Sequence, residues 1–195
     1  AGAQCAVDLE SLPSGSEVVL AASGVSPDTQ MLLESLVQRI PGARMEDNVT
    51  AATTHLVTPM DSVSGLALQR STKYLTALAR GAWVVSTDWV RDSVKSGCWC
   101  PEAEYEIAGD KHTRGGPARA RRRREAGEAP LLVGIPCHVN TDGCHRSVNT
   151  EALKLITRLA GATMVERCGC RFVPEASSPS GPDAISSVQG QVHVL

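Results

Sequence analysis

The sequence is poor in aromatic residues, with six among 195, three of which are tryptophan. Proteins that bind single-stranded nucleic acid by base stacking present aromatic side chains along a basic groove, so this class is poorly supported. No apolar run approaches the roughly 18 residues of a membrane span, and neither end shows the pattern of a signal peptide. We therefore expect no membrane partner. The start at Ala1 favours a segment of a longer protein.

Cysteine is present, but without the regular spacing of a disulfide framework, and the number of cysteines, seven, is odd. This pattern favours a reducing compartment, nuclear or cytosolic. The residues that could be considered as zinc ligands are Cys98, Cys100, Cys168, Cys170, His112, His138 and His145. Because C-x-C is not the usual C-x₂₋₄-C spacing of zinc sites, we expect buried or half-buried thiols and no metal.

Motifs of common catalytic sites are also missing. The chain contains no G-x-x-x-x-G-K-[ST], H-E-x-x-H or G-x-S-x-G sequence. The neighbours Cys137 and His138 do not by themselves make a nucleophile and its base. We expect no catalytic residue and no cofactor, so the sequence favours a binding protein over an enzyme.

The first 107 residues alternate between short apolar runs and segments with helical spacing. Strands are expected over 17–22, 43–45, 54–58 and 83–85, and helices over 27–40, 71–79 and 87–96. Ser26 and Ser86 are candidate N-caps, and Gly81 and Gly97 are candidate helix ends. The order β-α-β-β-α-β-α predicts a small, parallel, four-stranded α/β sheet with helices on both faces, because parallel neighbours need crossover connections.

Apolar residues at helical spacing predict which helix faces are buried. They are Met31, Leu32, Leu36, Val37 and Ile40 in the first helix, Tyr74, Leu75 and Leu78 in the second, and Trp89, Val90 and Val94 in the third.

A basic stretch follows this pattern, with seven basic and three acidic residues between Asp110 and Glu128. It has glycine and proline but no apolar periodicity, which is typical of an exposed linker. The interpretation that we favour is a solvated connector; the alternative is a nucleic-acid or nuclear-import patch.

After the linker the pattern restarts at an offset of 119 residues, which aligns Leu36 with Leu155 and the helix stop Gly42 with Gly161. The offset also places Asp142-Gly143 opposite Ser23-Gly24. The second copy is expected to be incomplete, because no equivalent of the last strand and the tryptophan-bearing helix follows. The predicted organisation is a flexible segment 1–16, repeat 1 over 17–107, a basic linker 108–130, a partial repeat 2 over 131–170 and an irregular tail 171–195.

Several stretches resemble the BRCT family. They are SGV at 23–25, TTHLVT at 53–58, RSTKYLTALARGAWVVSTDWV at 70–90, YEI at 105–107, GD at 109–110 and GPARAR at 116–121. The resemblance covers residues 17 to 166 and is strongest in the first repeat. It implies the BRCT fold with Trp89 and Trp83 in the core, Trp89 being the family's most recognisable residue.

The resemblance also implies a phosphoserine-peptide reader. Ser23, Gly24 and Lys73 match the phosphate-binding positions of the family. Ser71 is a candidate to orient or supplement Lys73 in binding the phosphate. These residues suit the task, because a phosphate with a charge near −2 needs several charge-assisted donors. Gly24 has no Cβ to hold the phosphate away, and Lys73 lies near a helix start where the dipole favours an anion.

For the third residue after the phosphoserine, the resemblance implies a pocket for phenylalanine between the two repeats. The matching positions are Arg70, Leu75 and Val148. Leu75 and Val148 are smaller than the family pattern would place there, so we expect weak selection of phenylalanine. The alternative for Leu75 and Val148 is an ordinary place in the core between the repeats.

At the level of the cell, the resemblance implies a nuclear DNA-damage-response and repair protein, including repair by homologous recombination, that recruits phosphorylated partners with Ser-x-x-Phe-like motifs. It further implies that ubiquitin-ligase activity would belong to a RING domain of a longer parent protein, whose zinc-binding sequences do not occur here. Two alternatives stay open: a BRCT scaffold that binds partners independently of phosphate, and DNA contact through Arg121, Arg122, Arg123 and Arg124.

Overall fold

The computed structural model describes residues 17–145 and 149–166. The chain divides into two compact units, with the boundary between Glu128 and Ala129. Three predictions, for the segment 1–16, for Val148 and for the tail 171–195, fall outside the described residues. The alternating pattern of residues 17–107 lies within the first unit.

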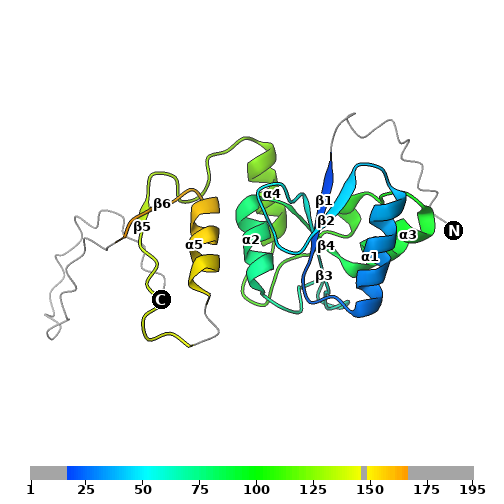
Figure 1. The fold of residues 1–195 in the computed structure, drawn as a ribbon, viewed down its shortest axis with the longest axis horizontal. Helices are drawn as coiled ribbons and strands as arrows, with labels where there is room; N and C mark the ends of the chain where they lie inside the picture. The colour runs from blue at the N-terminus through cyan, green and yellow to red at the C-terminus, as the bar shows by residue number, and fades with distance from the viewer. Residues whose placement is uncertain (1–16, 146–148, 167–195) are drawn as a thin grey trace, which may run out of the picture. The chain divides into compact units, whose positions relative to one another are not determined.

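A parallel four-stranded sheet forms the centre of the first unit (Figure 1). Its strands are β1 (Val18–Ala22), β2 (Ala43–Glu46), β3 (His55–Thr58) and β4 (Trp83–Ser86). They lie in the order β2-β1-β3-β4, and each neighbouring pair is parallel. The predicted α/β fold with four parallel strands is confirmed.

Helices cover both faces of this sheet, as Figure 1 shows. Helices α1 (Pro27–Arg39) and α3 (Thr87–Ser96) pack together on one face, and α2 (Thr72–Arg80) lies on the other. The Ser26 hydroxyl caps α1 by accepting a hydrogen bond from the Thr29 N–H at 3.3 Å. Ser86 occupies the N-cap position of α3, but its side chain makes no capping hydrogen bond. The predicted N-cap position of α3 is therefore correct, but the expected capping hydrogen bond is not formed.

The core consists of two apolar clusters, one on each face of the sheet. Neighbouring residues of a strand point to opposite faces, so Leu20 joins the cluster under α1 and α3 while Ala21 joins the cluster under α2. In the same way, Val57 and Leu56 divide between the two clusters. Both central strands are therefore buried on both sides, which explains the continuous apolar run of β1.

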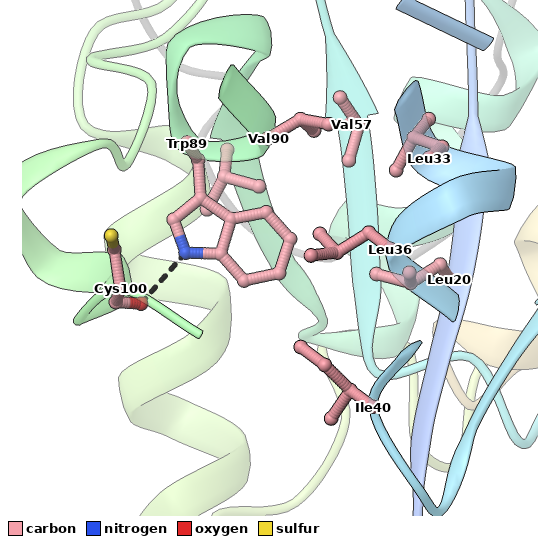
Figure 2. Packing of buried hydrophobic residues seen from close by; sticks show 9 residues of the cluster. Leu20, Leu33, Leu36, Ile40, Val57, Trp89, Val90 and Cys100 are labelled. Carbon is pink, nitrogen blue, oxygen red and sulfur yellow. Dashed lines mark hydrogen bonds between the residues drawn. The ribbon is translucent and has the colours of Figure 1, made fainter. Parts of the chain in front are cut away.

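Trp89 fills the middle of the cluster under α1 and α3 (Figure 2). Its side chain is fully buried, and its indole Nε1–H donates to the Cys100 carbonyl at 2.8 Å. The ring also stacks on His55, with the two centroids 5.2 Å apart. Trp83 is only partly buried and packs at the edge of the same cluster. Trp89 thus lies inside the core, whereas Trp83 lies at its margin.

The buried face of α1 differs from the predicted one at two positions. Leu33 is fully buried, whereas Met31 is 60% exposed. Leu33 precedes Leu36 by three residues and Ile40 by seven, so helical spacing places these three side chains on one face. Met31 shares its side of the helix with the polar residues Glu34 and Gln38. The prediction of Met31 as a core residue is therefore wrong.

The basic stretch contains a helix, α4 (Gly116–Glu125), which packs against α2 and follows the short 3-10 helix η1 (Glu102–Glu104). Arg121 on α4 is 13% exposed, and its Nε and Nη2 donate to Glu106 at 2.9 and 3.0 Å. Its guanidinium carbon lies 3.7 Å from the centroid of the Trp83 ring. The predicted exposed linker over 108–130 is thus wrong for residues 116–125. Because this helix packs through proline and arginine, no apolar periodicity marks it in the sequence.

The second unit contains strands β5 (Pro136–Cys137) and β6 (Thr163–Met164), paired in parallel, and helix α5 (Thr150–Leu159). The helix expected from the repeat is present, and the glycine after it, Gly161, has a positive φ of 94° where Gly42 after α1 has 78°. A left-handed residue at this place ends a helix, and glycine adopts it without strain.

The strand pairing corrects one part of the repeat alignment. In the first unit Val18 lies opposite Ala43, whereas in the second unit Cys137 lies opposite Met164. Shifting the first pair by 119 would place residue 137 opposite residue 162, so the strand before α5 is displaced by two residues. The alignment of Asp142-Gly143 with Ser23-Gly24 is therefore wrong, because the connection between strand and helix is longer in the second unit.

Two leucines at equivalent repeat positions provide a stability test. Leu36 is 1% exposed and Leu155 is 40% exposed. We expect Leu36→Ala to lower the free energy of unfolding by about 2 to 5 kcal/mol, because it leaves a cavity in a closed core. Leu155→Ala should cost less than about 1 kcal/mol, because its side chain already contacts water. Urea denaturation of the full chain measures both, and equal losses would contradict the burial difference.

Candidate phosphate-binding site

The four residues predicted to bind phosphate lie at one edge of the first unit. Ser23 and Gly24 follow directly on β1, and Ser71 and Lys73 lie at the start of α2. The hydroxyl oxygens of Ser23 and Ser71 are 2.6 Å apart, and the Lys73 ammonium donates to the Ala22 carbonyl at 3.0 Å. The fold therefore brings together two segments that are about 50 residues apart. We name Ser23, Gly24, Ser71 and Lys73 the phosphate cradle.

Ser71 has a structural task that the sequence did not reveal: it is the N-cap of α2. Its Oγ accepts a hydrogen bond from the Tyr74 N–H at 3.1 Å. The N–H groups of Thr72 and Lys73 belong to the first turn, where a helix has no internal partner for them. They stay available at a helix end whose dipole favours negative charge.

Gly24 has the backbone conformation that its place in the cradle needs. Its φ is +68°, in the left-handed region, and a Cβ here would lie 3.3 Å from the Gln69 Oε1 atom. A side chain would therefore be strained by its φ and crowded by Gln69. Gly24 is exposed, and within the described residues its N–H has no hydrogen-bond partner, so it can donate to a bound anion.

Lys73 remains able to bind an anion although it already contacts a carbonyl. An ammonium group has three donors, and the Ala22 carbonyl uses one. This contact fixes the ammonium beside the end of β1 rather than leaving it in solvent. The next residue, Tyr74, contributes no charge: burial above all, and then the negative charge of Asp110, raises the pKa of Tyr74 to about 12. Tyr74 therefore adds no negative charge beside the Lys73 ammonium.

The residues predicted for the third position after the phosphoserine are less fully described. Arg70 forms an ion pair with Asp110, with its Nε 3.3 Å from Oδ2. Leu75 is half-buried against the apolar cluster under α2. Val148 lies outside the described residues. The pocket between the repeats stays a prediction.

Asp110 has contacts that the sequence did not reveal, although GD at 109–110 contributed to the resemblance. The carboxylate is 3% exposed, and Oδ1 accepts hydrogen bonds from the N–H groups of His112 and Thr113 at 2.7 and 3.0 Å. An aspartate that bonds to the backbone two and three residues later is a recognised turn signal. That signal predicts the turn, but not the ion pair with Arg70.

The arginines of α4 do not form one uniform basic surface. Arg121 is held by Glu106 and Glu125, and the bond to Glu106 raises the pKa of Arg121. Arg123 lies 3.5 Å from Glu128. The prediction of a four-arginine DNA contact is therefore wrong for Arg121, whose guanidinium is engaged within the fold.

The described residues contain neither a candidate metal site nor a candidate membrane span. In the described part of the chain, no group of three or more His, Cys, Asp or Glu side chains could hold a metal ion. Cys168 and Cys170 lie outside the described residues. Among the residues that the structure describes, no helix is long and apolar enough to cross a membrane.

Most of the sheet and helices of the first unit lie in a stretch that is similar to a known family. Residues 14–94 match the sequence profile of the BRCA1 C Terminus (BRCT) domain. The first unit has a BRCT-like fold. BRCT domains are interaction modules rather than catalytic domains. The match ends before Asp110 and α4, so these parts of the first unit lie beyond the matched residues.

Relatives extend the BRCT likeness over more of the chain. The breast cancer type 1 susceptibility protein homolog of Rattus norvegicus is 27% identical over 152 residues, which are 77% of this chain and 8% of that protein. The BRCA1-associated RING domain protein 1 of Arabidopsis thaliana is 28% identical over 150 residues, 76% of this chain and 20% of that protein. The chain thus spans a fifth or less of the length of these relatives.

One solved structure shows the same fold. The BRCT5-BRCT6 domains of Brc1 from S. pombe superpose with a TM-score of 0.53 at 19% sequence identity, covering 76% of this chain and 66% of that one. At this identity the likeness shows the fold alone. Together with the relatives, it confirms the predicted resemblance to a tandem BRCT region of the breast cancer type 1 susceptibility protein.

Proposed function

We propose that the first unit binds peptides that contain phosphoserine, with the phosphate held in the phosphate cradle. The observation that carries this proposal is the contact of the Ser23 and Ser71 hydroxyls, 2.6 Å apart, beside the Lys73 ammonium and the start of α2. Two segments distant in the sequence therefore place hydroxyl, ammonium and backbone donors at one point.

Each cradle residue has a separate task in this proposal. The Ser23 hydroxyl and the Gly24 N–H donate to phosphate oxygens, and the Lys73 ammonium supplies the positive charge. Ser71 orients the Ser23 hydroxyl and caps α2. Hydrogen bonds between charged groups and phosphate are about twice as strong as neutral ones, so phosphorylation should dominate the affinity.

Selection along the peptide is the second part of the proposal. Arg70 holds the peptide backbone, and Leu75 and Val148 contact the residue three positions after the phosphoserine. Leu75 is half-buried, which leaves part of its side chain for such a contact. Because a leucine offers less apolar contact area than an aromatic ring, we propose weak preference for phenylalanine in a Ser-x-x-Phe-like motif.

The relatives support a place in DNA repair. The family resemblance to the rat and Arabidopsis proteins, which are named for BRCA1, favours recruitment of phosphorylated DNA-damage-response proteins in the nucleus. Any ubiquitin-ligase activity of a longer protein would then belong to a RING domain that these 195 residues do not contain.

A calorimetric titration with paired peptides tests the proposal. The peptides are a Ser-x-x-Phe sequence with phosphoserine and the same sequence with serine. We expect the phosphorylated form to bind at least about tenfold more tightly, since a charge-assisted hydrogen bond contributes about 1.5 to 3 kcal/mol. Equal affinity would reject phosphate recognition and support a phosphate-independent scaffold. Binding of duplex DNA with a steep salt dependence would instead support contact through the α4 arginines.

A further inference from the structure

Asp110 is a buried carboxylate that the proposed phosphate contacts do not use. Its Oδ1 accepts two backbone hydrogen bonds, from His112 and Thr113, and its Oδ2 faces the Nε of Arg70 at 3.3 Å. Both oxygens are therefore occupied. The Asp110 side chain is 3% exposed and the Arg70 side chain is 44% exposed. A buried carboxylate therefore forms an ion pair with a guanidinium group that is partly in contact with solvent.

The turn that carries Asp110 is rigidly built. Gly109 has a φ of +144°, and a Cβ there would lie 2.2 Å from the Thr113 carbonyl oxygen, so no other residue fits without a backbone shift. The Asp110 N–H donates to that same carbonyl at 3.0 Å. The carboxylate is thereby fixed by its own turn, independently of Arg70.

The same turn is attached to the loop that leads into α2. The Gly109 carbonyl accepts a hydrogen bond from the Ala67 N–H at 2.8 Å, and the Ala108 N–H donates to the Gly65 carbonyl at 2.9 Å. Arg70 follows this loop and directly precedes the cradle residue Ser71. Asp110 therefore contacts the peptide-binding segment from a part of the chain beyond the residues that match the family profile.

We propose that Asp110 is a positioning residue for the phosphopeptide site and that it acts through Arg70. It holds Nε, so that the two Nη groups of Arg70, which have no partner among the described residues, keep one orientation and can bind a peptide carbonyl or carboxylate. An arginine held in this way loses less conformational freedom when the peptide binds. This inference rests on the proposed phosphopeptide function.

Removal of the Asp110 charge should change the affinity for the phosphopeptide in opposite directions, depending on whether Asp110 acts by positioning Arg70 or only by its charge. A negative charge near a phosphate with a charge near −2 repels it, so neutralisation alone should tighten phosphopeptide binding. Loss of the Arg70 tether should weaken it instead. Asp110→Asn separates these effects, because asparagine keeps an oxygen for the N–H groups of His112 and Thr113 while it loses the charge.

The experiment is a double-mutant cycle on the full chain with the phosphorylated Ser-x-x-Phe peptide, using Asp110→Asn, Arg70→Gln and the double variant. We expect Asp110→Asn to weaken binding about three- to tenfold, and to change affinity less than about twofold once Arg70 is already glutamine. Asp88→Asn is the matched control: it removes the same charge from an ion pair with Arg91 on α3 and should leave affinity unchanged.

Each outcome decides a separate claim. If the wild-type chain shows no preference for the phosphorylated peptide, the proposed function fails before any variant is made. If that preference holds and Asp110→Asn tightens binding, or weakens it equally with and without Arg70, the positioning role is overturned. Thermal unfolding shows whether each variant is folded. Should Arg70→Gln unfold the chain, the direction of the Asp110→Asn change alone decides.

Discussion

Replacing Lys73 with methionine should reduce affinity for the phosphoserine peptide by about 10- to 100-fold, because it removes a charge-assisted hydrogen bond worth about 1.5 to 3 kcal/mol. Methionine keeps the length and the apolar stem of the side chain. The Ala22 carbonyl loses its contact with the ammonium, but this end of β1 is partly exposed, so water can replace the donor. We therefore expect the fold to be retained.

Lys95→Met is the control for this change. Lys95 lies on α3, is 75% exposed and pairs with Asp92, so its loss removes one positive charge away from the cradle. Calorimetry with the phosphorylated and unphosphorylated peptides should show that Lys73→Met removes most of the preference for phosphate while Lys95→Met keeps it. Retention of the full preference in Lys73→Met would place the phosphate elsewhere.

The largest loss of stability is expected for Trp89→Ala. This change empties the centre of the cluster under α1 and α3 (Figure 2) and removes the hydrogen bond from Nε1 to the Cys100 carbonyl. Truncation of a buried tryptophan costs about 3 to 5 kcal/mol. For a domain of this size, such a loss should lower the melting temperature by about 12 °C or more.

Met31→Ala is the matched control for the tryptophan change. Met31 is 60% exposed on α1, the helix whose Leu36 packs in the same cluster as Trp89. Its truncation should change stability by less than about 0.5 kcal/mol. Differential scanning calorimetry compares the two variants with the wild type. A small effect of Trp89→Ala would mean that the first unit is not organised around this side chain.

The fold of the first unit follows from local signals in the sequence. The buried strand β1 is a short apolar run, β3 contains β-branched residues, and Ser26 and Gly81 mark helix ends by their own chemistry. These signals act within a few residues, so they can be read without tertiary structure. The burial of Leu33 also follows from such a signal, because Leu33 precedes Leu36 by three residues and Ile40 by seven, whereas Met31 does not share that spacing.

Part of the phosphate cradle could also be predicted from the sequence. The resemblance identified Ser23 and Lys73, but only the folded chain shows that Ser23 meets Ser71 across 48 residues. Asp110 and Arg121 were missed because a buried charged residue has no periodic signature, and its meaning depends on a distant partner. Arg70 and Glu106 are those partners.

The most direct test of phosphate binding in the cradle is a ¹H–¹⁵N NMR titration of the full chain with the two peptides. We expect the amide signals of Ser23, Gly24 and Lys73 to shift on addition of the phosphoserine peptide and to stay in place with the unphosphorylated one. Shifts that are absent from these residues, or that are the same for both peptides, would contradict a phosphate site between β1 and α2.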